Sequence, residues 1–192
     1  EGALETRAAV AKYLEKYELN YDPGREIIIT MGGMGALSST LLTLIDPGDE
    51  VLIQDPQWLN YVSQVNFVRG VPVRVPVYEE EKFSLKAENI LKKLTDKSKI
   101  LILNSPNNPT GAVIGKNDLR AIAELAIQKD LFVISDEVYS ELIYDGEQHR
   151  SIASFPGMKE RTIIINSLSK SFAMTGWRIG FAAGPSNIIS KL

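Results

Sequence analysis

Short runs of apolar residues recur along the chain, and each is followed by a turn and then by a stretch with helical spacing. Two of these runs, Ile27-Ile28-Ile29 and Ile163-Ile164-Ile165, contain no alternating polar residue. Uninterrupted runs of this kind are typical of strands buried on both faces, as in a parallel sheet covered by helices. The pattern predicts seven strands, at Glu26–Thr30, Val51–Gln54, Val71–Val77, Ile100–Leu103, Leu131–Ser135, Thr162–Asn166 and Gly180–Ala183.

The stretches beside and between these strands predict helices. The helix predicted at Leu119–Lys129 has an apolar face, and Asn117 is its predicted N-cap. Strands that alternate with helices of this length indicate an α/β domain with a mostly parallel central sheet and helices on both faces. The predicted helices are Leu4–Tyr17, Met34–Ile45, Gln57–Val68, Ala87–Leu94 and Leu119–Lys129.

The composition of the 192 residues, with 44% hydrophobic and 23% charged, is that of an ordinary globular domain. The net charge of −3 gives no indication of a nucleic-acid or anionic-membrane partner. The chain has no cysteine, which excludes thiol catalysis and thiolate metal sites, and its single histidine, His149, excludes a multi-histidine metal site. We therefore expect a cytoplasmic protein with no metal site.

The first motif that could carry chemistry is Thr30-Met31-Gly32-Gly33-Met34-Gly35-Ala36-Leu37, where a predicted strand leads through small residues into a helix. Backbone N–H groups and the positive end of the helix dipole favour an anion such as phosphate at this place, and glycine permits close approach. The motif matches neither the dinucleotide fingerprint nor the P-loop, so a plain tight turn is the alternative interpretation.

Four more side chains lie in the segments that follow predicted strands. Trp58 suits stacking on a flat ligand, and Asn108 lies in a rigid loop that is rich in proline and asparagine. Asp136, with Tyr139 one turn further on, places a carboxylate at the end of an apolar strand, where a buried acid needs a cationic partner. The structural alternatives are a packing tryptophan, an ordinary loop and a helix N-cap.

The last group is Ser167-Leu168-Ser169-Lys170, followed by Arg178. A lysine next to a buried strand can be desolvated and act as a nucleophilic amine, whereas a solvated lysine is the alternative. Ser167, Ser169 and Arg178 suit a charge-assisted phosphate clamp. The Ser-x-x-Lys spacing of penicillin-recognising enzymes is also present, but the partner motifs of that class are missing.

All these groups are expected at one edge of the sheet, because the carboxyl ends of parallel strands share an edge. Together they complement pyridoxal phosphate, which has a phosphate, a flat ring, a phenolic oxygen, a pyridine nitrogen and an aldehyde. The chain resembles the large-domain core of the fold-type I pyridoxal-phosphate enzymes, specifically the class I/II aminotransferases related to aspartate aminotransferase. The motifs that carry the resemblance are Gly33–Ala36, Asp46–Val51, Asn107–Gly111, Asp136–Tyr139, Ser167-x-Ser169-Lys170 and Gly176–Gly180.

The resemblance implies a role for each residue. Lys170 forms a Schiff base with the cofactor, Asp136 pairs with the pyridinium nitrogen, and Tyr139 completes the catalytic set. Asn108 and Tyr139 hold the phenolic oxygen, and Trp58 stacks on the ring. The phosphate is held by Ser167, Ser169, Arg178 and the backbone of Gly33 and Met34, since Met34 lacks the hydroxyl that relatives have there.

The resemblance also implies the activity, which is transfer of an amino group from an amino acid to a 2-oxo acid by a homodimer with shared active sites. Residues 1–192 correspond to the pyridoxal-phosphate-binding large-domain core, without the N-terminal segment and the C-terminal small domain of the family. The last residues, 185–192, predict the start of a capped helix. Another pyridoxal-phosphate enzyme (a C–S lyase, decarboxylase or cyclase) and a non-catalytic cofactor-sensing domain are the alternatives.

Overall fold

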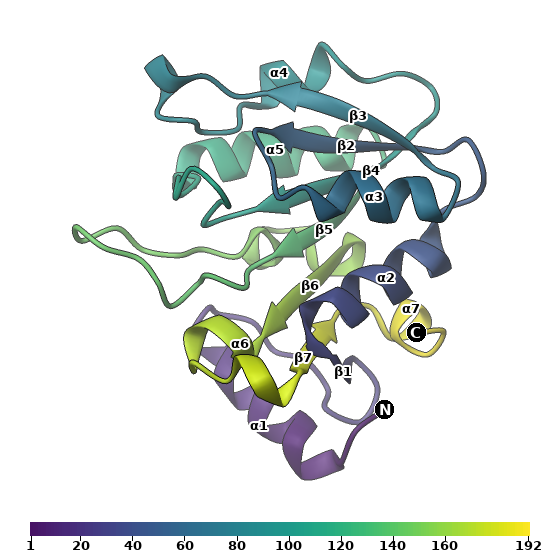
Figure 1. The fold of residues 1–192 in the computed structure, drawn as a ribbon, viewed down its shortest axis with the longest axis vertical. Helices are drawn as coiled ribbons and strands as arrows, with labels where there is room; N and C mark the ends of the chain where they lie inside the picture. The colour runs from purple at the N-terminus through teal and green to yellow at the C-terminus, as the bar shows by residue number, and fades with distance from the viewer.

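A seven-stranded sheet with the order β1-β7-β6-β5-β4-β2-β3 forms the centre of the protein, whose computed structural model describes residues 1–192 (Figure 1). Every predicted strand is present, and its ends differ from the prediction by at most two residues. The strands are β1 (Ile27–Met31), β2 (Glu50–Asp55), β3 (Val71–Pro76), β4 (Ser98–Asn104), β5 (Phe132–Asp136), β6 (Thr162–Ser167) and β7 (Ile179–Ala183).

Six of the seven strands run in the same direction. The neighbours from β6 through β5, β4 and β2 to β3 are parallel, while β7 pairs antiparallel with both β6 and β1. The mostly parallel sheet predicted from the sequence is therefore confirmed. Because β7 is reversed, the residues just before it lie at the same edge as the carboxyl ends of the other strands.

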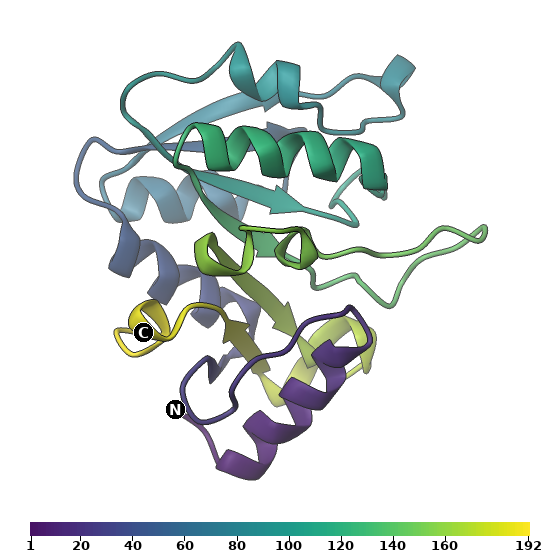
Figure 2. The same cartoon turned by 180° about the vertical axis from the view of Figure 1, so that it is seen from behind.

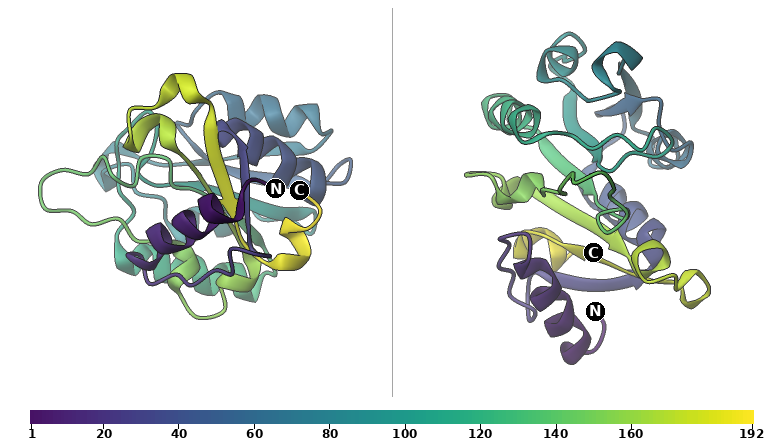
Figure 3. Two further views of the ribbon diagram at one scale, coloured as in Figure 1. Left: turned by 90° about the horizontal axis from the view of Figure 1, so that it is seen from below. Right: turned by 90° about the vertical axis from the view of Figure 1, so that its left-hand side faces the viewer.

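Helices cover both faces of the sheet. In the views from opposite sides, α2, α3 and α7 lie on one face and α1 and α5 lie on the other (Figures 1 and 2), and the turned views show the sheet between these layers (Figure 3). No helix has both the length and the apolar composition needed to cross a membrane. The α-helices are α1 (Leu4–Glu15), α2 (Gly32–Leu44), α3 (Asn60–Phe67), α4 (Ala87–Leu91), α5 (Lys116–Gln128), α6 (Leu168–Ser171) and α7 (Ser186–Ile189), and short 3-10 turns are η1 (Glu79–Glu81), η2 (Ile152–Ser154), η3 (Lys159–Arg161) and η4 (Thr175–Trp177).

Strand β4 shows why the apolar runs carry no alternation. Ile100 and Ile102 belong to the core that includes α2 and α3, whereas Leu101 and Leu103 belong to the core that includes α5. All four are buried, and burial of each such side chain stabilises the fold by roughly 1.5–3 kcal/mol. Successive residues of a strand point to opposite faces, so a strand covered on both sides needs apolar residues at every position.

The main differences from the sequence prediction lie at helix starts. Helix α5 begins at Lys116 with Gly115 as its N-cap, so the prediction of Asn117 as N-cap is wrong. The carbonyl of Gly115 accepts the 2.9 Å hydrogen bond from the Leu119 N–H, which starts the helix two residues earlier than an Asn117 cap allows. Helix α3 begins at Asn60, and Trp58 therefore lies in the turn before it. The helix predicted at 185–192 is present only as the four residues of α7.

Candidate active site

A cavity of about 250 Å³ opens at the edge of the sheet where β1, β2, β4, β5 and β6 end and β7 begins. The ten residues predicted to form a site all line it, although they come from segments spread over most of the chain. The expectation that they converge on one crevice is therefore met by the geometry. The lining residues are Gly33, Met34, Trp58, Tyr61, Asn104, Asn108, Asp136, Val138, Tyr139, Ser167, Ser169, Lys170, Thr175 and Arg178.

One end of the cavity is formed by the first turn of α2. Gly180 lies so close to this turn that a Cβ at its position would be 2.4 Å from the carbonyl carbon of Gly32, and Gly32 itself has a φ of +66°. These two glycines allow α2 to begin directly against β7. The first N–H groups of a helix have no acceptor within the helix, so the turn at Gly33 and Met34 can bind an anion in the cavity.

Two serines and an arginine lie next to this turn. Ser167 Oγ donates to Ser169 Oγ at 2.9 Å and accepts a 3.2 Å hydrogen bond from the Ser169 N–H. The guanidinium of Arg178 donates to Ser169 Oγ at 3.4 Å and to the carbonyl of Thr175 at 3.0 Å, and it has no carboxylate partner. A cation and two hydroxyls beside free backbone N–H groups suit a phosphate dianion.

Asp136 is a buried carboxylate without a cationic partner. It is 7% exposed, and its oxygens accept a 2.6 Å hydrogen bond from the Tyr61 hydroxyl and a 3.2 Å hydrogen bond from the Val138 N–H. Burial raises the pKa of Asp136 to about 6, the two hydrogen bonds oppose this rise, and the charge of Glu137 adds to it. No helix follows Asp136, so the alternative interpretation as a helix N-cap is wrong.

Asn108 and Tyr139 lie side by side, with the Asn108 amide 3.4 Å from the Tyr139 hydroxyl. Asn104 holds the loop that carries Asn108, because its Oδ1 accepts a 2.8 Å hydrogen bond from the Asn108 N–H and its amide donates to the Asp136 carbonyl at 3.0 Å. Trp58 packs edge-to-face on Tyr61 at a centroid distance of 5.4 Å. An amide, a phenol and an indole thus surround the space in front of Asp136.

Lys170 lies on the four-residue helix α6 and forms no ion pair; its Nζ is 5.8 Å from the centroid of the Tyr139 ring. The residue is exposed, so the expected desolvation by the neighbouring strand is wrong for this chain. The reason is that the buried strand β6 ends at Ser167, so Lys170 lies three residues beyond it on the short helix α6.

Sequence reasoning missed four lining residues, of which Tyr61 and Asn104 make specific hydrogen bonds to Asp136. Asn104 had a usable signal, since it stands directly after an apolar run, like the residues that were selected. Tyr61 had none, because a tyrosine within a helical segment has the same pattern whether its hydroxyl is paired with water or with a distant carboxylate. The other two residues act through their backbone, because the Val138 N–H donates to Asp136 and the Thr175 carbonyl accepts from Arg178.

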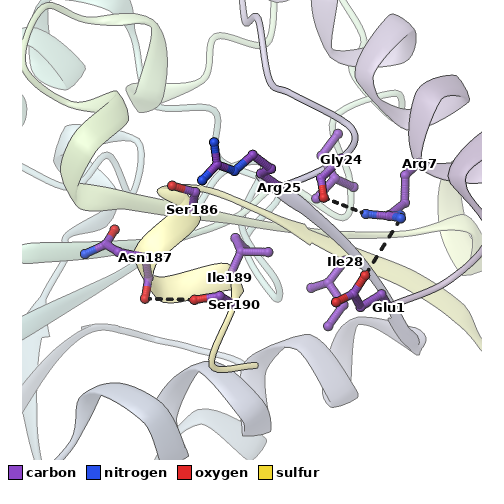
Figure 4. Close-up of a pocket in the computed structure, with 10 residues that line it drawn as sticks. Glu1, Arg7, Gly24, Arg25, Ile28, Ser186, Asn187, Ile189 and Ser190 are labelled. Carbon is purple, nitrogen blue, oxygen red and sulfur yellow. Dashed lines mark hydrogen bonds and ion pairs between the residues drawn. The ribbon is translucent and has the colours of Figure 1, made fainter.

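A second pocket, of about 390 Å³, lies between the segment near residue 25 and α7 (Figure 4). Two arginines line it: Arg7 donates to the Gly24 carbonyl at 3.1 Å and lies 3.8 Å from the Glu1 carboxylate, whereas Arg25 forms no ion pair. None of the predicted site residues lines this pocket. The cavity at the sheet edge, which all ten predicted residues line, is therefore the candidate active site.

The fold and the cavity define an α/β domain whose site combines an anion-binding end, a buried carboxylate and a lysine. Over residues 1–192 the chain matches the family described as "Aminotransferase class I and II", and it belongs to that family. The resemblance inferred from the motifs is thus confirmed.

Individual relatives agree with this assignment. The chain is 48% identical to an aspartate aminotransferase of Pyrococcus abyssi and 46% identical to aromatic-amino-acid aminotransferase 2 of Thermococcus litoralis, over 100% of this chain and 49% of each relative. The crystal structure of an aromatic aminotransferase from Pyrococcus horikoshii OT3 matches with a TM-score of 0.97 and 49% identity, covering 99% of this chain and 51% of that one. The chain spans about half the length of the curated relatives it matches.

Proposed function

We propose that the cavity binds pyridoxal phosphate and that the protein transfers an amino group from an amino acid to a 2-oxo acid, with Lys170 as the attachment point through a Schiff base. The observation that carries the proposal is the placement of three groups in one cavity: the buried acid Asp136, the lysine Lys170 and the unpaired cation Arg178. Membership of the aminotransferase family supports it. Residues 1–192 then form the cofactor-binding large-domain core.

The residues present fit this cofactor. Arg178, Ser167 and Ser169 would bind the phosphate together with the first N–H groups of α2. Asp136 lacks a cation and would receive one in the protonated ring nitrogen, which removes the energetic cost of its buried charge. Asn108 and Tyr139 would present an amide and a hydroxyl to the phenolic oxygen, and Trp58, which lines the cavity, would stack on the ring.

When bound, pyridoxal phosphate supplies a cationic ring that withdraws electron density from the α-carbon of an amino acid attached to it. The part of this chain is to position groups and to move protons. Asp136 would keep the ring nitrogen protonated, because an ionised carboxylate next to it favours the charged form. Lys170 Nζ would accept the proton that leaves the substrate α-carbon and hold it for the later protonation.

The surface around the cavity supports a homodimer with shared sites. Met31, Leu59 and Trp177 are 76%, 80% and 69% exposed. In the sequence, Leu59 and Trp177 stand next to residues that line the cavity, and Met31 stands two residues before one. Exposed large apolar side chains close in sequence to site residues are consistent with a surface that another subunit covers. Such a cover would also exclude water from Lys170. The absence of cysteine supports a cytoplasmic location.

The test is an assay of the natural polypeptide that carries this chain, loaded with pyridoxal phosphate and offered a panel of amino acids with a 2-oxo acid acceptor. We expect stoichiometric formation of the 2-oxo acid of the donor and the amino acid of the acceptor, measured by mass spectrometry. The Lys170→Ala variant should lose this activity, and the exposed-lysine control Lys93→Ala should retain it. Release of carbon dioxide, ammonia or a thiol instead of paired products would show another pyridoxal-phosphate reaction, and cofactor binding without turnover would show a sensing domain.

A further inference from the structure

Directly behind the proposed cofactor site lies a buried acid that the proposed chemistry does not use. Glu137 follows Asp136, and its side chain is 1% exposed. Adjacent residues of an extended strand point to opposite faces, and the Glu137 side chain accordingly bonds with Ser135 and not with the cavity groups. A carboxylate removed from water in this way requires several donors.

Three donors meet this carboxylate. Glu137 Oε1 accepts hydrogen bonds from Ser135 Oγ at 2.8 Å and from Ser151 Oγ at 2.6 Å. Glu137 Oε2 accepts a hydrogen bond from His149 Nε2 at 2.9 Å, and the imidazole is 3% exposed. Ser135 belongs to β5, whereas His149 and Ser151 come from the segment that returns from the loop of residues 138–148. The carboxylate therefore joins the two ends of this loop.

The loop is the long green excursion that leaves the sheet edge in Figures 1 and 2. It begins with Val138 and Tyr139, which line the cavity, and Val138 N–H donates to Asp136. Most of its remainder, from residue 142 to residue 148, is exposed. Hydrogen bonds at its base are thus what fixes the start of the loop relative to β5.

Helix α1 and the turn that follows it contact the same loop from outside. Tyr17 packs edge-to-face on His149 with a centroid distance of 5.0 Å, and its hydroxyl donates to Glu141 at 2.8 Å. Tyr13 donates to Glu141 at 2.6 Å, and Lys16 forms an ion pair with the same carboxylate. The loop base is held by specific polar contacts from two directions.

One detail points to a role in positioning rather than in stability alone. His149 Nδ1 is buried and has no hydrogen-bond partner, because Nε2 is the nitrogen that faces Glu137. A buried polar atom without a partner costs free energy, and such atoms in native structures call for an explanation. Here the ring orientation that leaves Nδ1 unpaired is the one that allows Nε2 to hold the carboxylate.

We propose that Glu137 and His149 are positioning residues, which join both ends of the 138–148 loop and so hold the Asp136 carboxylate and the Tyr139 hydroxyl in the geometry that the cofactor ring requires. This inference rests on the proposed function, since the ring is the group that they serve. Neither side chain touches the cavity, so both act through Asp136 and Tyr139.

The experiment measures the Kd for pyridoxal phosphate and the visible spectrum of the loaded protein for His149→Ala, His149→Gln and Ser151→Ala, with Glu147→Gln in the exposed part of the loop as control. We expect the Kd to weaken about tenfold in His149→Ala, with a shifted absorption band, and to recover in His149→Gln, whose amide can replace the Nε2 donor. Ser151→Ala removes a single hydroxyl and provides a milder variant should His149→Ala fail to fold.

A combination with Tyr139→Phe separates positioning from stability. If His149 acts through the loop base, the effect of His149→Ala on the Kd should be smaller in the Tyr139→Phe background than in the wild type. A lower melting temperature with unchanged Kd and spectrum in all folded variants would overturn the proposal, as would full additivity in the double variant. Failure of the wild-type protein to bind the cofactor would instead contradict the proposed function.

Discussion

The hydroxyl of Tyr61 donates a 2.6 Å hydrogen bond to the carboxylate of Asp136, although the two residues are 75 positions apart in the sequence. Tyr61 lies on α3, which covers one face of the sheet, and Asp136 ends β5 at the edge of the cavity. Both side chains are buried. The contact sets the orientation of the acid and supplies one of the two hydrogen bonds that oppose the effect of burial on its pKa.

Replacing the tyrosine removes this donor and little else. In Tyr61→Phe we expect the pKa of Asp136 to rise further above about 6, because desolvation remains while a stabilising hydrogen bond is lost. The pKa can be followed by carboxyl NMR in the cofactor-free protein. Tyr78→Phe, which changes a tyrosine with no hydrogen bond to a side chain, is the control and should leave the Asp136 titration unchanged. An unaltered or lower pKa in Tyr61→Phe would contradict the geometry.

The raised pKa of Asp136 also makes a prediction about folding stability. The folded state binds the proton more tightly than the unfolded state, so the stabilisation from this group is complete below pH 4 and is lost as the pH rises through about 6. The loss amounts to about 3 kcal/mol in the cofactor-free protein. Urea denaturation from pH 4 to 7 should show this slope in the wild type and in the exposed-site control Asp96→Asn. Asp136→Asn should lack it, and an identical slope in all three proteins would contradict the prediction.

Because β7 lies very close to the start of α2, we predict that a side chain at Gly180 destabilises the fold and weakens cofactor binding. A Cβ there would lie 2.4 Å from the Gly32 carbonyl carbon and 2.7 Å from the Gly33 nitrogen, both of which are backbone atoms that cannot rotate away. We expect Gly180→Ala to lower the free energy of unfolding by about 1–3 kcal/mol and to weaken cofactor binding, because the anion-binding turn must shift.

The matched control is Gly35→Ala, which lies in α2, the helix that Gly180 contacts. Its Cβ would meet its nearest neighbours at 3.6 Å, which is ordinary contact, and alanine is the better helix former by up to about 1 kcal/mol. Denaturant unfolding should therefore rank Gly35→Ala at or above the wild type and Gly180→Ala well below it. The opposite order would show that the two elements are further apart than the structure indicates.

Arg178 predicts selectivity for the phosphate group. In Arg178→Ala we expect the Kd for pyridoxal phosphate to rise and the Kd for pyridoxal to stay the same, because a charge-assisted hydrogen bond is lost for the phosphorylated compound alone. The Kd of pyridoxal divided by that of pyridoxal phosphate should therefore fall by about 10- to 100-fold. Arg120→Ala, at an exposed position of α5, is the control. Equal weakening of both compounds in Arg178→Ala would place the arginine away from the phosphate.

The strands could be predicted because apolar runs depend only on burial. Ile100 through Leu103 have to be apolar wherever the sheet is covered on both faces. The direction of β7 could not be predicted in this way, since its apolar residues read the same in either orientation. Yet the reversal of β7 is what brings Arg178, which precedes the strand, to the edge where the other groups follow their strands.

The candidate site was predictable where polar residues stood at a strand end, as at Asp136, or in the loop after one, as at Asn108, because strand topology alone brings such ends together. Features that depend on side-chain packing were not predictable. The Tyr61 hydroxyl reaches Asp136 only through the docking of α3, and the exposure of Lys170 follows from its place on α6, beyond the end of β6. The wrong N-cap at Asn117 has a local cause, since an extended Gly115 can end the preceding loop equally well.

The most direct test of the account asks where pyridoxal phosphate becomes covalently attached. The protein is incubated with the cofactor, reduced with borohydride, digested and mapped by mass spectrometry. We predict a single modified peptide with the label on Lys170, retained in Lys93→Ala and absent from Lys170→Ala. Stoichiometric labelling of a different lysine, or a protein that binds the cofactor while Lys170 stays unlabelled, would contradict the central claim.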